Sequence, residues 1–316
     1  MYCKCKKRFH HATVNFDIPM IISVINQKGG VGKTTTAVNL AVSVAQWGQE
    51  TLLVDLDPQG NATSAIGITS LISPTLYDCL IEYSNDGAKS LRNANAEHCN
   101  AEYSDAGLNA HNKKSAFVLG TQDDPSMPAV VESAVKNLWV LGTSSELAGA
   151  EVELAHNEKR DDLKRVLKTL EKRFSLILID TPPSLSIITV NALVAADRLV
   201  IPVQCEYFAL EGLGQLLRTL ELIKRNLNPQ LNVLGLLRTM YTARLGLNEQ
   251  VSQELEKHFQ SLLFKTIIPR NVRLAESPSH GLPIALYDRR SVGADAYRRL
   301  GIEVLKRLEI PVKCAK

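Results

Sequence analysis

The chain has no apolar run approaching the roughly 18 residues that a membrane-spanning helix requires. Its first residues are basic, but the apolar stretch that follows such residues in a secretory signal is missing. Neither an exported nor a membrane-embedded protein is indicated, and we expect a cytoplasmic one. With 316 residues, 45% of them hydrophobic, the chain is long enough to bury a large core.

Closely spaced cysteines are also scarce. Of the six cysteines only Cys3 and Cys5 are near each other, and with His10 and His11 they form C-x-C-x4-HH, which matches no common zinc pattern. We therefore expect free thiols in a reducing cytoplasm rather than a metal site or a disulfide framework.

A large excess of one charge is missing too, because the net charge is +3. The distribution is nevertheless uneven. Residues 20–206 carry 15 Lys and Arg against 22 Asp and Glu, whereas residues 207–316 carry 17 against 10. A basic C-terminal third favours a polyanionic partner. The simpler interpretation is that these charges are scattered over solvated helix faces. The charge distribution taken alone favours this interpretation.

Residues 1–19 show no periodicity, and we expect them to form a flexible N-terminal extension. From Met20 the pattern becomes regular. The apolar run IISVI (21–25) predicts a strand, the spacing in TTTAVNLAVSVAQWG predicts a helix that ends at Gly48, and TLLVDLD (51–57) predicts a second strand. Together they form one βαβ unit.

Strands and helices alternate through the remainder of the chain. Further strands are expected at 138–142, 176–180, 198–203, 233–237 and 263–268, with helices at 158–173, 187–196, 209–225, 248–261 and 291–308. Short, continuously apolar strands separated by helices indicate a mostly parallel sheet covered on both faces. We predict a single doubly wound α/β domain over residues 20–316.

One segment interrupts this alternation. Residues 85–112 contain six Asn and six Ala, but no Val, Ile, Phe, Trp or Pro. Such a stretch buries too little apolar surface to offset the entropy lost on ordering. We predict a low-complexity surface insertion, disordered or loosely helical, over about 85–135.

The stretch NQKGGVGKTTTAVN (26–39) joins the first predicted strand to the first helix. Glycines at 29, 30 and 32 let the backbone curl, so that its N–H groups and the helix N-terminus form an anion site. Lys33 would then reach phosphate groups and the Thr34 hydroxyl would bind Mg²⁺. The pattern is that of a phosphate-binding loop, although Gln27 stands where glycine is usual.

Two further predicted strands end in carboxylates. Asp55 closes one strand, with Asp57 just beyond it, and Asp180 closes FSLILID. Ligands of open α/β sheets bind at the carboxyl ends of strands, so these three side chains are expected to converge on Mg²⁺ and the γ-phosphate.

KGGVGKTT (28–35) resembles the deviant Walker A motif of the ParA/MinD superfamily. The resemblance to the ParA/Soj chromosome- and plasmid-partitioning ATPases covers residues 20–308 apart from 85–135. It rests on LLVDLDPQGNATSAIGI (52–68), LAGAEVEL (147–154), LILIDTPPSLSIITVNAL (176–193), IPVQCEYFALEGLGQLL (201–217) and IIPRNVRLAESPSHGLPIALYD (267–288). It implies a P-loop NTPase fold of the SIMIBI, MinD-like type, and Mg²⁺-dependent hydrolysis of ATP.

The resemblance also implies roles for individual residues. Lys28 would be the signature lysine, which reaches the partner's nucleotide in an ATP-bound dimer, and Asp57 would position the attacking water. Asp55 and Asp180 would hold the water shell of Mg²⁺ together with Thr34. The implied catalytic residues are Lys28, Lys33 and Asp57, and the implied nucleotide contacts are Lys28, Gly29, Gly30, Val31, Gly32, Lys33, Thr34, Thr35, Pro269, Arg270 and Asn271.

Members of this family bind double-stranded DNA non-specifically as the ATP dimer and release it when a ParB-type protein stimulates hydrolysis. The resemblance therefore implies a homodimer, DNA and a ParB-type partner, with the protein on the bacterial nucleoid and not stably on a membrane. Arg244 and Arg273 match basic positions used for DNA. Lys257, Arg270, Arg298 and Arg299 could add to such a patch.

Two alternatives stay open at this point. A MinD-like membrane switch would need a free amphipathic helix near the C-terminus, but the apolar residues of 294–308 equally suit a helix packed on the sheet. Electron transfer of the nitrogenase iron-protein kind would need two cluster-binding cysteines, and Cys205 has no suitably placed second. Arg238 departs from the family pattern, since an apolar residue is more common there, near the expected base pocket.

Overall fold

The computed structural model describes residues 19–69, 71, 74–84, 118–119, 128–143, 145–156, 160–243 and 245–312. Several predicted features lie outside these residues: nearly all of the N-terminal extension with Cys3 and Cys5, most of the expected insertion, and Arg244.

The described strands form one eight-stranded sheet in the order β3-β4-β5-β2-β6-β1-β7-β8. The strands are β1 (Met20–Val24), β2 (Thr51–Asp55), β3 (Val118–Leu119), β4 (Val130–Glu132), β5 (Leu138–Leu141), β6 (Leu176–Asp180), β7 (Arg198–Gln204) and β8 (Asn232–Thr239). From β5 to β8 all pairings are parallel, while β3 and β4 pair antiparallel at one edge. The predicted doubly wound α/β fold is confirmed.

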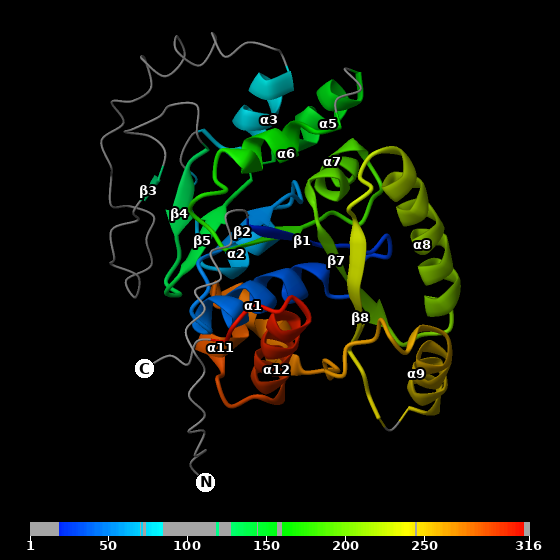
Figure 1. Ribbon diagram of the computed structural model, residues 1–316. Coiled ribbons are helices and arrows are strands. Elements are labelled where there is room, and N and C mark those ends of the chain that lie inside the picture. Colours follow the sequence, from blue (N-terminus) through cyan, green and yellow to red (C-terminus); the bar gives the residue numbers. More distant parts are fainter. Residues whose placement is uncertain are drawn as a thin grey trace.

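Helices cover both faces of this sheet (Figure 1). The layer with α1 contains α1 (Lys33–Gln46), α2 (Asn61–Ala65), α11 (Ile284–Tyr287) and α12 (Val292–Arg307). The opposite layer contains α3 (Leu76–Ser84), α5 (Leu147–His156), α6 (Asp162–Lys168), α7 (Ile187–Ala195) and α8 (Ala209–Asn226). Three further elements lie towards the C-terminus: α9 (Gly246–Phe259), α10 (Val272–Glu276) and the 3₁₀-helix η1 (Ser277–His280).

The helix near the C-terminus, α12, packs on the α1 side of the sheet. Its apolar residues Tyr297, Leu300, Val304 and Leu305 are buried in the cluster that also contains α1. A Cβ at Gly301 would lie 2.2 Å from Ser43 Oγ. Helices α1 and α12 therefore approach so closely at this point that a residue with a side chain would not fit. The described helices include none long and apolar enough to cross a bilayer.

Three expectations from the sequence differ from the structure. The strand expected at 263–268 does not form beyond an isolated bridge between Leu236 and Leu263. The N–H of Phe264 still donates to Leu236 O at 3.0 Å, but the carboxylate of Glu303 accepts the two N–H groups that follow, from Lys265 at 2.7 Å and Thr266 at 2.9 Å. These donors are therefore not available to a strand ladder.

The predicted insertion also extends too far toward the C-terminus. Within 85–135, β3 and β4 extend the sheet, and Val130 and Val131 of β4 are buried against β5. These valines supply the apolar, β-branched side chains that the Asn- and Ala-rich part lacks. The helix expected at 158–173 is shorter than predicted, because α6 ends at Lys168.

Candidate active site

The loop between β1 and α1 is curled by glycine. Gly30 and Gly32 have φ values of 73° and 87°, in the left-handed region that side-chain-bearing residues avoid. A Cβ built on Gly29 or Gly30 would have no described atom within 4 Å, apart from atoms of that glycine and of the residues directly before and after it. Because α1 begins directly after Gly32, its first N–H groups adjoin this open space. The arrangement suits a bound chain of phosphates.

Lys33, the first residue of α1, is buried, with 7% of its surface exposed. Its ammonium donates to the carbonyl oxygen of Lys28 at 3.2 Å, across the loop. Burial lowers the pKa of Lys33, and the negative charges of Asp180 and Asp57 oppose that shift. The structure therefore brings a cation and two of the predicted carboxylates together beside the glycine loop.

Asp55 and Asp180 end neighbouring parallel strands in the same register, with Val24 of β1 opposite Asp180 on its other side. Both aspartates are fully buried. Burial raises the pKa of Asp180, as does the negative charge of Asp55, and neither oxygen of Asp180 makes a hydrogen bond of normal geometry within the described residues. Burial also raises the pKa of Asp55, to about 6. The hydroxyl of Thr34 lies close enough to Asp180 to oppose this rise in its pKa. Two adjacent buried carboxylates with a threonine hydroxyl beside one of them fit a site that receives a divalent cation.

Within the described residues, no cluster of three or more His, Cys, Asp or Glu side chains is arranged to hold a metal. A cation at Asp55 and Asp180 would thus need oxygen ligands from elsewhere. Mg²⁺ is commonly held in this way, by one or two carboxylates together with water and substrate phosphates.

Replacement of Asp180 with asparagine is expected to stabilise the nucleotide-free protein near neutral pH. The pKa of Asp180 is raised by folding, so its contribution to stability is complete at low pH and is lost as the pH rises through the folded value. The gain should be about 1–2 kcal/mol, with about 2–4 °C in Tm per kcal/mol. Thermal unfolding at about pH 7.5 and about pH 5 measures it, because the gain should shrink at the lower pH.

The Asp161→Asn variant serves as the control, because that carboxylate is half exposed and pairs with Arg165 at the surface. A lower Tm for Asp180→Asn at the higher pH would contradict the conclusion that burial destabilises the charged form of Asp180.

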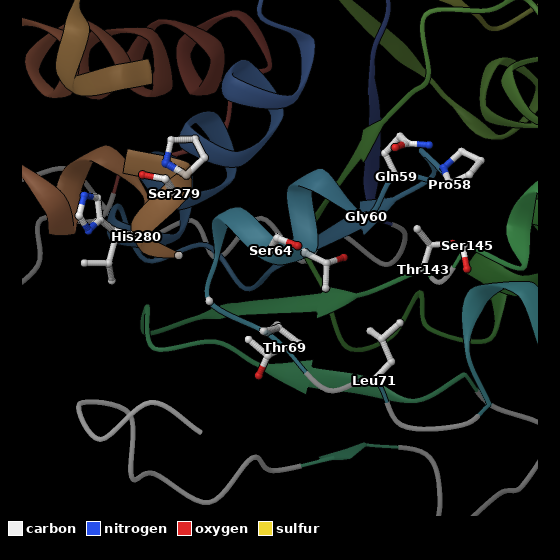
Figure 2. Close-up of a pocket in the computed structure, with 16 residues that line it drawn as sticks. Pro58, Gln59, Gly60, Ser64, Thr69, Leu71, Thr143, Ser145, Ser279 and His280 are labelled. Atoms are coloured by element: carbon white, nitrogen blue, oxygen red, sulfur yellow. The ribbon is translucent and has the colours of Figure 1, made fainter. Parts of the chain in front are cut away.

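Asp57 lies two residues beyond Asp55 and is largely buried. Its Oδ1 accepts the N–H of Gln59 at 3.0 Å, and its own N–H donates to Asp55 Oδ1 at 3.3 Å. Directly after Asp57, residues 58–60 line a cavity of about 1050 Å³. Figure 2 shows Pro58, Gln59, Gly60 and Ser64 on one part of the cavity lining and Ser279 and His280 on another.

The second lysine of the loop differs from Lys33. The side chain of Lys28 is 47% exposed, and its Nζ pairs with Glu206 at 2.5 Å. The Lys28 N–H donates to Asn26 Oδ1, and Asn26 Nδ2 donates to the carbonyl of Pro202, which ties this part of the loop to β7. Lys28 therefore lies at the exposed rim of the site, not inside it.

The segment predicted to lie near the base adjoins the end of β8. Tyr241 donates its N–H to Ile268 O and accepts from the N–H of Arg270, while Thr239 Oγ1 donates to Val31 O in the glycine loop. Pro269 to Asn271 are thus brought to the same edge of the sheet as the loop. The side chain of Asn271 accepts the N–H of Leu274 and caps α10.

Arg238, the departure from the family pattern, is accounted for by packing. Its guanidinium donates to Ser252 Oγ at 2.7 Å and pairs with Glu256 at 2.5 Å, both on α9. Because neighbouring residues of a strand face opposite ways, Arg238 points away from the loop that Thr239 contacts. Its side chain does not enter the expected base region.

Of the two predicted DNA-binding residues, Arg273 lies exposed on α10. It pairs with Glu276 at 3.0 Å and with Asp288 at 3.7 Å. Arg244 lies outside the described residues. Two residues with roles at this edge were not singled out from the sequence: Glu206, the partner of Lys28, and Thr63, which donates to Asp55. No local pattern signals either, because each contact depends on the tertiary fold or on a short, irregular helix.

A family model described as an AAA domain matches residues 19–233. The sporulation initiation inhibitor protein Soj of Bacillus subtilis (strain 168) is 44% identical over 286 residues, which cover 90% of this chain and 97% of Soj. The chromosome partitioning protein ParA of Myxococcus xanthus is 42% identical over 91% of this chain and 88% of its own length. The chain belongs to the ParA/Soj family of chromosome-partitioning ATPases.

The resemblance read from the motifs is thereby confirmed, and the ParA/Soj protein described here is an ATPase of the P-loop class. A solved structure titled cobyrinic acid a,c-diamide synthase from Mycobacterium smegmatis, with bound ATP analogue and magnesium, matches its fold. The TM-score is 0.69 at 29% identity, over 92% of this chain and 96% of that one. The glycine loop, Lys33 and the paired aspartates of this ParA/Soj chain are its candidate active site.

Proposed function

We propose that this protein is an ATP-dependent DNA-partitioning ATPase with ATP and Mg²⁺ as its cofactors. ATP binding drives homodimerisation and non-specific binding to double-stranded DNA, and hydrolysis stimulated by a ParB-type partner releases the DNA. The cycle segregates or positions chromosome or plasmid DNA on the nucleoid, in the bacterial cytoplasm. One observation carries the proposal: the same glycine loop holds one lysine buried beside two aspartates and a second lysine at its exposed rim.

The buried lysine would serve the nucleotide of its own subunit. The N–H groups of residues 29–35 and the ammonium of Lys33 would hold the phosphates, and Asp57 would position the attacking water. The location of Asp57 supports this role, since its charge acts on Lys33 while its backbone begins the loop around the large cavity. Phosphoryl transfer depends mainly on such placement and on positive charge near the γ-phosphate.

Thr34, Asp55 and Asp180 would hold Mg²⁺, whose positive charge would offset the negative charge of the phosphates. The full burial of Asp180, the nearness of the Thr34 hydroxyl to it and the register pairing of the two aspartates support this assignment.

The exposed lysine would serve the nucleotide of a second subunit. Lys28 lies at the rim, and within the described residues its side chain is held by a solvent-exposed ion pair, so its ammonium can reach an anion outside its own subunit. A cation supplied in this way makes ATP a ligand shared by two subunits, and nucleotide binding then favours the dimer.

DNA binding would use Arg244 and Arg273, whose arginine side chains suit phosphate contacts. Replacing both with alanine should weaken DNA binding about 100-fold or more, since each charge-assisted contact contributes about 1.5 kcal/mol. The slope of log affinity against log salt should become shallower by about 2 to 4, at one phosphate per arginine and subunit. ATP-driven dimerisation should be unchanged.

The experiment measures binding to unrelated duplexes with ATP, with ADP and without nucleotide, over a salt series. The control replaces Arg165 and Lys168 of α6, in the layer on the opposite face of the sheet from α1 and α12 (Figure 1). Binding that needs ATP, falls with salt and ignores sequence supports the proposal. A double variant that still shifts DNA at low salt would place the DNA-binding surface elsewhere.

The membrane-switch alternative has lost its main support. The apolar side chains of α12 are buried against α1 and are not available to lipid. Cys205, the one cysteine considered for a metal cluster, is buried as well, and burial raises the pKa of its thiol to about 11. Such a thiol does not readily form the thiolate that a cluster requires.

A further inference from the structure

The short helix α2 holds one oxygen of Asp55. Thr63, in the middle of this helix, donates to Asp55 Oδ2 twice, from its backbone N–H at 2.8 Å and from its hydroxyl at 2.7 Å. Thr63 is buried, with 4% of its surface exposed, and Asp55 is fully buried. Both donors are directed at the same carboxylate oxygen, while Oδ1 accepts, from the described residues, the longer bond of 3.3 Å from the N–H of Asp57.

This arrangement fixes how the Asp55 carboxylate is turned. A carboxylate held by donors on one oxygen cannot rotate without breaking those bonds, and the second oxygen keeps most of its capacity to accept. Because Thr63 and Asp55 are both buried, a water molecule is poorly placed to replace the Thr63 hydroxyl if it is removed. The hydroxyl is therefore well placed to set the orientation of a group at the metal site.

The position of Thr63 depends in turn on where α2 lies. Just beyond the helix, Gly67 has a φ of 85°, and a Cβ there would lie 2.7 Å from the carbonyl oxygen of Gly281. This backbone contact joins the end of α2 to the segment that follows η1. Figure 2 shows the two segments along the same cavity, with Gly60 and Ser64 from one and Ser279 and His280 from the other.

We propose that Thr63 is a positioning residue of the magnesium site, with its hydroxyl holding the Asp55 carboxylate in the orientation that receives the hydrated cation. The inference rests on the proposed function, in which Asp55 belongs to that site. Hydrogen-bond partners of metal-binding side chains contribute about 10- to 100-fold to metal affinity. Thr63 keeps its backbone donor in any variant, so the lower end of this range is expected for loss of the hydroxyl.

The experiment titrates Mg²⁺ in the presence of a fluorescent, non-hydrolysable ATP analogue and records equilibrium binding to the full chain. Thr63→Val removes the hydroxyl and keeps the shape. It should raise the Mg²⁺ concentration for half-maximal binding about 10-fold. Thr63→Ser restores the hydroxyl and should behave as wild type. Thr51→Val is the matched control, because Thr51 is also fully buried, lies at the other end of β2, and donates its hydroxyl to Gln49 O at 2.9 Å.

Thermal unfolding without nucleotide or Mg²⁺ shows whether each variant is folded. An unchanged Mg²⁺ requirement in Thr63→Val, with a raised one in Asp55→Asn, would overturn the positioning role and leave the proposed function intact. An unchanged requirement in Asp55→Asn would remove Asp55 from the metal site, and the inference would fall with that assignment. An equal rise in Thr51→Val would also overturn it, because the effect would then follow from general destabilisation of β2.

Discussion

Lys33→Ala is expected to lose ATP binding by about 100-fold or more, because truncating one partner of a buried, hydrogen-bonded charge pair costs about 3 kcal/mol or more. Lys33 is almost fully buried at the start of α1, beside the curled loop and close to Asp57 and Asp180. Without the Lys33 ammonium, no positive side chain at this position would offset the repulsion between the phosphates and the two carboxylates. Equilibrium binding of a fluorescent ATP analogue in the presence of Mg²⁺ measures the loss.

Lys28→Ala is the matched control, because it removes the other lysine of the same loop. Its ammonium is exposed and pairs with Glu206, so the variant should keep the nucleotide affinity of the isolated subunit. Lys33→Ala must also unfold at a Tm near that of wild type. Wild-type ATP affinity in a folded Lys33→Ala protein would refute the assignment of this loop to phosphate.

Asp57→Ala is expected to bind ATP and form the dimer but to hydrolyse ATP about 100- to 10,000-fold more slowly, the usual contribution of a group that orients or deprotonates the attacking water. The affinity should survive, because Asp57 lies beyond the strand end and its charge opposes rather than assists the binding of an anion. Single-turnover hydrolysis and light scattering with ATP give the two readouts.

Asp57→Asn separates chemistry from loop structure. An asparagine oxygen can still accept the N–H of Gln59, which the aspartate now accepts at 3.0 Å, so the loop should keep its shape. Both variants should therefore lose hydrolysis alike. A monomeric Asp57→Ala protein in saturating ATP would show that the residue acts in assembly rather than in hydrolysis.

The part of the fold nearest the nucleotide loop could be predicted closely. Local sequence patterns predict the strand before the loop, the loop itself from its glycine spacing, and the helix after it. The observed β1 and α1 agree with these predictions. The strand ends bearing Asp55 and Asp180 were also recognisable. That the two carboxylates are register neighbours depends on β2 lying beside β6, and this sheet order has no local signal.

The errors arose where side chains from distant parts of the chain decide the outcome. Residues 263–268 are apolar enough for a strand, but Glu303 of α12 takes the N–H groups of Lys265 and Thr266. Glu206 lies 178 residues from Lys28, and nothing in either local sequence pairs them. Thr63 stands inside a motif that was recognised, yet its bonds to Asp55 require the five-residue helix α2, which is too short to show periodicity.

The ion pair between Lys28 and Glu206 has a consequence for the effect of ionic strength. An exposed pair of this kind contributes about 0–1 kcal/mol, and dissolved salt screens it. In the proposed dimer the same lysine contacts a phosphate of the neighbouring subunit. Added salt would then weaken both the ion pair with Glu206, which Lys28 leaves on dimerisation, and the phosphate contact that it gains. The two effects on the dimerisation equilibrium therefore partly cancel. DNA binding has no such compensation, because salt competes directly for every phosphate. Rising salt should therefore detach the protein from DNA well before it separates the ATP-bound subunits.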